Sequence, residues 1–210
     1  KDCGKRWAAS CGILVCHSAH NEISENEISD LEYSGVSVGW VWGYAKSTTY
    51  GNVIRNNHIH HIGKGRLSDM GGIYLLGAQH GTVVSGNVVH DVISSNYGGM
   101  GIYTDEGSSY ITVEKNLVYD CSSNSLHQHY GKDNLIKNNI FAFSDDGQML
   151  ITRQEEHNSL FLYNNILVGD NEAMYDNAVD KDWFIDNNNL YWDYENGEKV
   201  FSNSNISVKK

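Results

Sequence analysis

The 210-residue chain contains no proline and only four cysteines, Cys3, Cys11, Cys16 and Cys121. Without proline, no residue removes a backbone N–H from a β ladder, so every segment is compatible with a continuous sheet. The cysteines lack the CxxC spacing of zinc sites, and three of them lie close together while the fourth is distant. We expect neither zinc nor a disulfide framework, and we interpret the four as small, buried apolar side chains.

Long apolar runs and an excess of positive charge are also missing. No stretch approaches the roughly 18 apolar residues of a membrane-spanning helix, and the opening segment "KDCGKRWAASCGILVCH" lacks the pattern of a signal peptide. The chain holds 15 Lys and Arg against 26 Asp and Glu, a net charge of −11. We therefore expect no nucleic-acid partner and no anionic membrane surface as a partner.

The chain does contain an internal repeat, and strongly amphipathic helix patterns are absent. Apolar residues, a polar pair ending in Asn and further apolar residues recur at Asn26, Asn57, Asn87, Asn116, Asn139, Asn165 and Asn189. Each unit holds short segments rich in Val, Ile, Tyr and Phe, which is typical of strands. Units of this size suit one turn of a parallel β-helix, in which rungs stack about 4.8 Å apart. The repeat predicts an all-β fold, a single-stranded parallel β-helix of about seven to eight rungs forming one domain over 1–210.

The recurring Asn is expected to be structural. One residue at a sharp corner must leave the β region, and Asn tolerates the left-handed conformation better than most residues. Stacked Asn amides can also bond from rung to rung as a ladder. The longer units, between Asn26 and Asn116, should carry the longer loops, where function concentrates. We expect further rungs before Lys1 in a longer parent protein, and a polar end, "EKVFSNSNISVKK", that covers the last rung.

Polar side chains replace apolar ones on successive rungs. Alignment on the Asn residues superimposes "GGIYLLG", "MGIYTDE", "SLHQHYG" and "LITRQEE". The predicted columns are Leu75–Thr104–His127–Arg153, Leu76–Asp105–Gln128–Gln154 and Gly77–Glu106–His129–Glu155. Because the inside of a β-helix is expected to be apolar, this polar strip indicates an outer groove for a long substrate, most simply a polysaccharide.

Each of these residues also has a purely structural interpretation. Asp105 and Glu106 could form a charged turn with Gly107 in the left-handed conformation. His127 and His129 could be a buried hydrogen-bonded pair, and with Asp105 they could even hold zinc, although no strong spacing motif supports this. Arg153 could form an ion pair with a neighbouring glutamate, Glu155 or Glu156.

Two further segments are candidates for the same groove. Asp69, in "LSDMGGIY", could be a fixed carboxylate or the start of an Asx turn. The segment "GWVWGYAKSTTYGN" contains Trp40, Trp42, Tyr44 and Tyr50. These aromatic rings could stack on sugar faces, or they could shield the core beneath a long loop.

The motifs together resemble a known family. "SGVSVGWVWGY", "GNVIRNNHIHHIGKGRLSDMGGIYLLGAQHGTVVSGNVVHDV", "YGGMGIYTDEGSS", "HQHYGKDNLIKNNIFAFS" and "TRQEEHNS" are similar to glycoside hydrolase family 141, from about residue 12 to about residue 170. The resemblance implies a right-handed parallel β-helix glycosidase with α-L-fucosidase activity on complex pectin or xylanase activity. It also implies an acid pair, carried here by Asp69 and Asp105. Leu126, where the family often has an aromatic residue, and "YLLGAQHG", where a smaller polar residue and Pro are usual, depart from its pattern.

Glycoside hydrolysis sets a geometric requirement on this acid pair. Carboxyl groups about 5–5.5 Å apart give retention of configuration, and about 6.5–9.5 Å gives inversion. If the segment containing Asp69 were a straight strand, it would lie roughly 20 Å from Asp105. The pairing therefore requires "SDMGG" to bend over the groove, which its two glycines permit. Otherwise Asp105 must pair with Glu106, Glu155 or an acid in a preceding rung.

The leading hypothesis is a secreted or periplasmic, monomeric, cofactor-free glycosidase, retaining in its stereochemistry, that acts on plant cell-wall polysaccharide. The residues expected to bind substrate are Glu106, His127, His129, Arg153, Glu155 and Trp42. A polysaccharide lyase is one alternative, with Arg153 or a Lys as base and Asp-bound Ca²⁺. A non-catalytic carbohydrate-binding β-helix is another.

Overall fold

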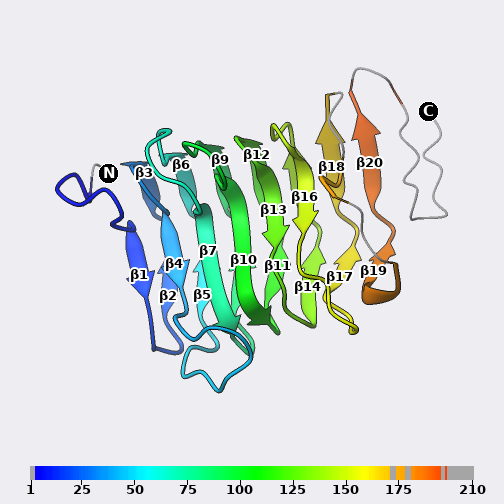
Figure 1. Ribbon diagram of the computed structural model, residues 1–210, viewed down its shortest axis with the longest axis horizontal. Coiled ribbons are helices and arrows are strands. Elements are labelled where there is room, and N and C mark those ends of the chain that lie inside the picture. Colours follow the sequence, from blue (N-terminus) through cyan, green and yellow to red (C-terminus); the bar gives the residue numbers. More distant parts are fainter. Residues whose placement is uncertain (1–2, 171–173, 178–180, 195–196, 198–210) are drawn as a thin grey trace.

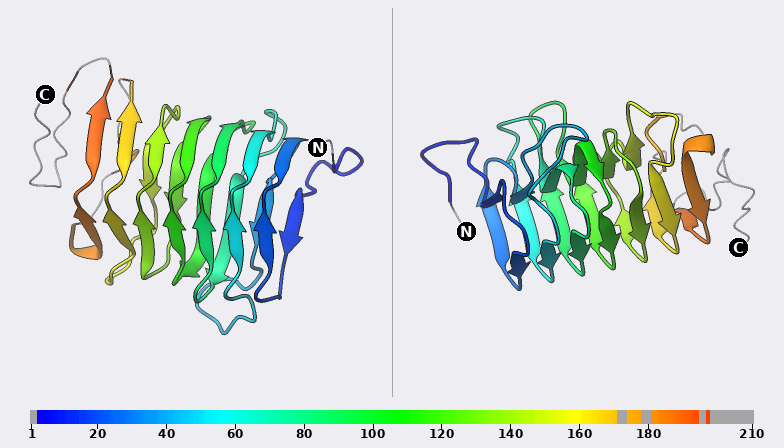
Figure 2. Two further views of the ribbon diagram at one scale, coloured as in Figure 1. Left: turned by 180° about the vertical axis from the view of Figure 1, so that it is seen from behind. Right: turned by 90° about the horizontal axis from the view of Figure 1, so that it is seen from below.

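The computed structural model describes residues 3–170, 174–177, 181–194 and 197, and within them the chain forms a right-handed parallel β-helix (Figure 1). The rungs advance along one axis from the N-terminal strands to the C-terminal ones, and three parallel sheets run along the sides (Figure 2). The predicted fold class is therefore confirmed.

The strands fall into three sheets, and within each sheet neighbouring strands pair in parallel. Sheet A, seen in front in Figure 1, contains β1 (Ile13–Val15), β4 (Val36–Val38), β7 (Gly71–Ala78), β10 (Met100–Ser109), β13 (Asn124–Gln128) and β16 (Gly147–Ile151). Sheet B contains β2 (Glu22–Ser24), β5 (Val53–Arg55), β8 (Val83–Ser85), β11 (Thr112–Glu114), β14 (Asn134–Lys137), β17 (Leu160–Tyr163) and β19 (Phe184–Asn187).

Sheet C completes each rung. It contains β3 (Glu27–Leu31), β6 (His58–Ile62), β9 (Val88–Val92), β12 (Leu117–Cys121), β15 (Ile140–Ala142), β18 (Ile166–Gly169) and β20 (Leu190–Asp193). A short 3-10 helix, Lys181–Trp183, precedes β19. In the described part of the chain, no helix has the length and apolar character needed to cross a membrane.

Every rung contributes apolar side chains to the inside of the coil, because alternate residues of a strand point to the same face. The stacked columns are Ile23, Ile54, Val84, Val113, Ile136 and Leu162 from sheet B; Ile28, Ile59, Val89, Val118, Phe141, Leu167 and Tyr191 from sheet C; and Val36, Ile73, Ile102, Leu126 and Met149 from sheet A. We expected an apolar interior from the sequence, but the interior also contains polar side chains. Thr104, Gln128 and Asn134 are fully buried and bond to one another, with Thr104 Oγ1 and Asn134 Nδ2 both donating to Gln128 Oε1.

The predicted Asn ladder is present at the corner between sheets B and C. Each amide donates to the Oδ1 of the Asn on the next rung at 2.9–3.0 Å, from Asn26 through to Asn189. The left-handed conformation was predicted for the Asn itself, however, and the structure has it at the preceding residue. Positive φ occurs at the residues preceding the ladder, Glu25, Asn56, Gly86, Lys115, Asn138, Asn164 and Asn188. The turning residue therefore points outward and varies in type, while the Asn behind it is held inside by its amide bonds.

Loop lengths differ around the coil. The longest segment without a strand in the described rungs joins β4 to β5, and it extends beyond the strand ends at the bottom of Figure 1. Two shorter connections precede β7 and β10. These loops lie in the longer repeat units, as predicted. The segment proposed to cover the last rung, 198–210, lies outside the described residues.

Candidate active site

The outer face of sheet A changes character at its two longest strands, β7 and β10. Tyr74 and Tyr103 pair in register, and Leu76 pairs with Asp105 two positions further along. Since these side chains share one face, Asp105 and the two tyrosines point outward together. Tyr74 donates a hydrogen bond of 2.6 Å to Asp105 Oδ2, and the Tyr74 and Tyr103 rings meet edge to face at 5.2 Å. Asp105 is thereby fixed, with only 5% of its surface exposed.

A bulge follows Asp105 on β10, because the pairing with β7 shifts between Asp105 and Ser109. Gly107 sits in this bulge with φ of +75°. A Cβ atom there would lie 2.4 Å from the Cα of Gly43, on the loop between β4 and β5. Gly43 N also donates to Glu106 O at 3.1 Å, so the loop lies directly on the bulge. Gly107 is left-handed, as the structural interpretation of "YTDEGSS" required, but within a strand rather than at a turn.

Asp69 reaches the same region through a bend just before β7. Its own φ is +57°, whereas Gly71 and Gly72 have no positive φ. Close packing leaves no room for a side chain at the two glycines. A Cβ on Gly72, for example, would lie 2.4 Å from Val89 Cγ1. The predicted bend is thus made by Asp69 itself. Its N–H donates to Tyr97 O at 2.7 Å and its carbonyl accepts from the Tyr33 hydroxyl at 2.9 Å.

Both acids line one pocket of about 420 Å³. Its walls include Tyr33, Tyr74, Trp40 and Trp42, together with Ala9, Ser10, Cys11, Leu14, Ser34, Ser37 and Leu76. Asp69 is exposed and Asp105 is buried within the same pocket. Trp40 and Trp42 are 50% and 58% exposed, so both present broad apolar surfaces at the pocket. Of the residues predicted for the site, Asp69, Asp105 and Trp42 are brought together here.

The negative charge of Asp105 acts on the titratable groups around it. Partial desolvation and then the negative charge of Asp105 raise the pKa of Asp69, while a hydrogen bond with Tyr103 opposes this shift. Burial and the charge of Asp105 also raise the pKa of Tyr103, so its hydroxyl remains protonated and able to donate. Tyr103 lies two positions before Asp105 on one strand face and bonds to Asp69, so one side chain links the two acids. Because its pKa is raised, Asp69 keeps its proton to a higher pH than an ordinary aspartate does.

The two histidines lie beside this pocket and do not line it. His127 is fully buried, its ring stacks on Tyr103 at 4.6 Å, and its Nε2 lies 2.8 Å from Thr152 Oγ1. His129 Nδ1 lies 2.7 Å from the same hydroxyl. Burial, and then the nearby His129, lower the pKa of His127 to about 3, so it is neutral at physiological pH. His127 is too deeply buried for the substrate contact that was expected, and the alternative of a buried, hydrogen-bonded histidine is confirmed; its ring supports Tyr103 from the adjacent strand.

The remaining predicted residues form a second network on the loop side of β10. Tyr130 donates to Glu106 Oε2 at 3.1 Å, and the Arg153 guanidinium lies 4.5 Å from the Tyr130 ring centroid. Tyr44 donates a short hydrogen bond to Glu155. Glu106, Arg153 and Glu155 are thus tied to tyrosines outside the acid pocket. Arg153, which was expected to bind substrate or, alternatively, to pair with a glutamate, lies over the Tyr130 ring and does not line the acid pocket.

The predicted columns were correct for one pair of rungs and wrong beyond it. Leu75 and Leu76 do pair with Thr104 and Asp105, but His127 pairs with Tyr103 and with Leu150. Gln128 and Ile151 occupy the positions that the alignment on Asn gave to His127 and Arg153, so it was wrong by one residue and by two residues, because the units differ in loop length. A shift of one residue moves a side chain to the other face of the sheet, which is why Thr104 points inward and His127 outward.

Among the described residues, no group of three or more His, Cys, Asp or Glu side chains is arranged to hold a metal ion. No disulfide joins any of the four cysteines, and only Cys121 is fully buried, so the interpretation of all four as core residues was wrong for Cys3, Cys11 and Cys16. Cys11 lines the acid pocket, and its partial burial raises the pKa of its thiol.

Sequence reasoning overlooked the tyrosines that hold the acids. Tyr33, Tyr74, Tyr97 and Tyr103 all contact Asp69 or Asp105 or influence their charges. The signal was available for two of them, since "GIYLL" and "GIYTD" place Tyr74 and Tyr103 in identical positions of adjacent repeats. Tyr33 and Tyr97 stand in loops, where the repeat predicts nothing.

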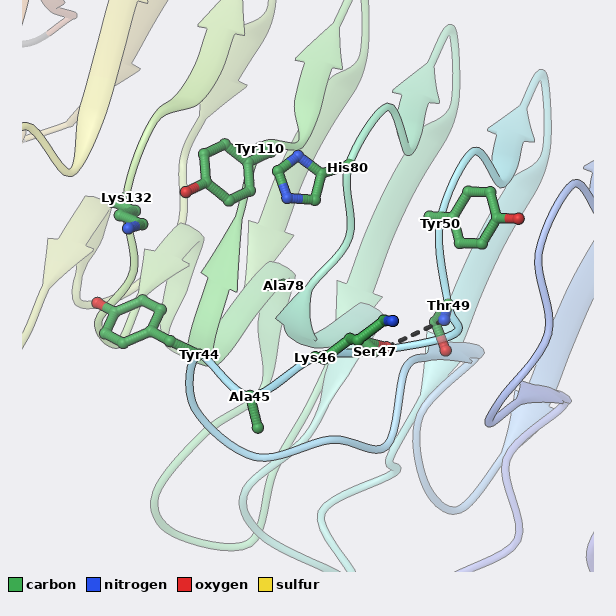
Figure 3. A pocket seen from close by; sticks show the side chains of 10 residues that line it. All are labelled: Tyr44, Ala45, Lys46, Ser47, Thr49, Tyr50, Ala78, His80, Tyr110 and Lys132. Carbon is green, nitrogen blue, oxygen red and sulfur yellow. Dashed lines mark hydrogen bonds between the residues drawn. The ribbon is translucent and has the colours of Figure 1, made fainter.

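A second cavity, of about 480 Å³, lies on the other side of the loop between β4 and β5 (Figure 3). Its walls are Tyr44, Ala45, Lys46, Ser47, Thr49 and Tyr50 from the loop, and Ala78, His80, Tyr110 and Lys132 from the coil. We call it the basic pocket, because Lys46, Lys132 and His80 are its only titratable residues besides tyrosine.

The fold and the acid pocket together define a right-handed β-helix with an outer polar site on sheet A. The family model described as right handed beta helix region matches residues 1–141, and the chain belongs to this family. No curated protein and no solved structure was found to match the sequence. A β-helix domain of this kind fits carbohydrate-active proteins in general.

Proposed function

We propose that the protein is a glycoside hydrolase of the family 141 type that acts on plant cell-wall polysaccharide, with pectin side chains or xylan as the substrate class. The observation that carries the proposal is the pair of carboxyl groups, Asp69 and Asp105, in one pocket beside two exposed tryptophans. Glycoside hydrolysis requires one protonated acid and one carboxylate on either side of the scissile bond. Because the substrate is a polymer found outside cells, the protein is proposed to be secreted or periplasmic.

The two acids are assigned different roles by their surroundings. The pKa of Asp69 is raised by partial desolvation and by the charge of Asp105, which suits a general acid that protonates the leaving oxygen. Asp105 accepts the hydrogen bond from Tyr74 and acts as the second carboxylate, the nucleophile or the base. The product anomer, followed by NMR during the first turnovers, distinguishes these two possibilities for Asp105.

The tryptophans and tyrosines supply substrate contacts. Exposed indole faces at the pocket suit the apolar faces of pyranose rings, against which aromatic rings stack. Tyr74 donates to the carboxylate of Asp105 and Tyr103 bonds to the carboxyl group of Asp69, so these two hydroxyls hold the acids in place, while Tyr33 donates to the backbone carbonyl of Asp69.

The test is hydrolysis of a panel of xylan and pectin-derived oligosaccharides and aryl α-L-fucosides by the wild type, Asp69→Asn and Asp105→Asn. Each substitution should reduce kcat by about 10²–10⁴, the range expected for loss of an acid–base group. Asp133→Asn is the matched control, because Asp133 is an exposed aspartate with the same left-handed backbone as Asp69, with φ of +55°. It should retain wild-type rates.

Three outcomes contradict the proposal. Near-native rates in both Asp69→Asn and Asp105→Asn would remove the assigned acid pair. Release of an unsaturated, ultraviolet-absorbing product that disappears with a chelator would identify a lyase instead. Glycan binding by the wild type without turnover of any member of the panel would leave only the binding module.

A further inference from the structure

The basic pocket combines three features that the acid pocket lacks. No aspartate or glutamate lines it, although the chain carries a net charge of −11. Lys132 makes cation–π contacts with Tyr44 at 5.4 Å and Tyr110 at 5.6 Å. The salt bridges found among the described residues include neither Lys132 nor Lys46. Two ammonium groups therefore face one cavity without a carboxylate partner from the described part of the chain.

An aromatic platform stands beside these charges. His80 and Tyr110 come from adjacent rungs and stack face to face, with ring centroids 3.9 Å apart and planes inclined by 11°. Figure 3 shows this pair on the coil, with Lys132 and Tyr44 to one side and Tyr50 to the other, while Lys46 lies on the loop. A sugar ring that entered the pocket would meet aromatic surfaces and two cations at once, which is the chemistry that recognises a carboxylate-bearing pyranose.

One loop forms a wall of both cavities. Trp40 and Trp42 line the acid pocket, and Tyr44 to Tyr50 line the basic pocket. The loop is fixed between them where Gly43 rests on Gly107 and where Tyr44 donates to Glu155. Units of one oligosaccharide chain can therefore contact the same loop while they occupy different pockets.

We propose that the basic pocket is a subsite for an anionic sugar unit, a uronate, of the saccharide whose reacting bond lies at the acid pocket. The placement of the reacting bond rests on the proposed function, whereas the binding of the uronate does not. Lys132 and Lys46 pair with its carboxylate, and the His80–Tyr110 stack contacts its ring. The subsite makes an acidic, rather than a neutral, polysaccharide the preferred ligand of an otherwise anionic protein.

The experiment measures binding of trigalacturonate by isothermal titration calorimetry to the Asp105→Asn variant of the full chain, which prevents turnover. Fully methyl-esterified trigalacturonate is the matched ligand, since it has the same sugar rings without the negative charges. We expect the free acid to bind at least about tenfold more tightly than the ester, and its affinity to fall as NaCl screens the charges. Inorganic sulfate at equal concentration should not displace it, because sulfate cannot stack on the aromatic platform.

Lys132→Gln and Lys46→Gln should each weaken binding of the acid by about tenfold and leave binding of the ester unchanged. Lys137→Gln is the control, since Lys137 pairs with Glu114 on sheet B and does not line the basic pocket. It should bind both ligands as the parent does. Equal affinity for acid and ester, or no effect of either lysine substitution, overturns the subsite. Displacement by equimolar sulfate overturns the assignment to a sugar.

The two proposals can fail separately. If the wild type hydrolyses no glycan but the acid binds through Lys132 and Lys46, the subsite holds and the glycosidase assignment does not. If hydrolysis depends on Asp69 and Asp105 but the lysines do not distinguish acid from ester, the glycosidase assignment holds and the subsite does not.

Discussion

The corner between sheets B and C and the outer face of sheet A are built from the same rungs but by opposite means. At the corner, an Asn recurs in every described rung with nearly constant bond lengths. On the outer face of sheet A, strand lengths vary, a bulge interrupts β10, and Asp69 bends the chain into the pocket. Repetition therefore provides the support in this molecule, and the candidate site arises where the repetition is broken.

The largest effect is expected from breaking the regular side at Asn116. Its Nδ2 donates to Asn139 Oδ1 and Val84 O, and its Oδ1 accepts from both nitrogens of Asn87. Asn116→Ala leaves these buried groups unpaired and should lower the free energy of unfolding by about 4 kcal/mol. Urea denaturation measures this loss. Asn26→Ala, at the exposed end of the described ladder, should cost about 1 kcal/mol, and equal losses would contradict a cooperative ladder.

A smaller effect is expected from the irregular side at Gly107. Gly107→Ala combines a left-handed backbone with a Cβ 2.4 Å from Gly43 Cα, so the loop must move. We expect a loss of about 3 kcal/mol in urea denaturation, together with weaker glycan binding. Gly81→Ala is the matched control, since its φ is +72° but no atom lies within 4 Å of the added Cβ. It should cost only about 1 kcal/mol, and a comparable loss at both glycines would show that the loop contact contributes nothing.

Next in size is the dependence of stability on pH through His127. The pKa of His127 is about 3 in the folded protein and near 6.5 in the unfolded chain. Between these two values the histidine is protonated in the unfolded chain and neutral in the folded protein. The free energy of unfolding should therefore fall as the pH drops below 6.5, by about 2 kcal/mol between pH 7 and pH 5. His127→Gln removes this slope. Urea denaturation of both proteins at the two pH values measures it, and parallel changes would contradict the assignment.

The smallest effect is expected on the outer surface of sheet B, where Lys137 and Glu114 form a partly exposed ion pair of 3.1 Å. Glu114→Gln should change the free energy of unfolding by less than about 1 kcal/mol, because solvent screens such pairs. The glycan affinity of the variant should equal that of the parent. A large change in either quantity would show that the outer surface of sheet B does more than support the fold.

The regular features could be predicted from the sequence because each rung repeats the same physical problem. Val84 and Val113 occupy equivalent inward positions, and an Asn follows each at the corner between sheets B and C. Several copies of the same pattern therefore predict the same local structure. The bend at Asp69 occurs once, and it was attributed to the adjacent glycines because glycine is the usual left-handed residue. A single instance offers no such averaging.

The register of the later rungs was lost for a related reason. Counting from the Asn residues assumes that each unit holds the same number of residues between the corner and sheet A. The rung of His127 is one residue shorter than that number, and the rung of Arg153 is two residues longer. The acids could be found from "YTDEGSS" and "LSDMGG", and burial of His127 was one of two open interpretations, but its pairing with Tyr103 could not be predicted from the misaligned columns.

The loop between β4 and β5 has a consequence for how such a protein could diversify. It leaves sheet A after β4 and re-enters sheet B at β5 of the same rung, and its residues line both the acid pocket and the basic pocket. A change in its length or composition alters both cavities in one genetic event and leaves the inward columns untouched. The segment is thus an exchangeable cassette, through which one unaltered scaffold could be adapted to chains that differ in where they carry charge.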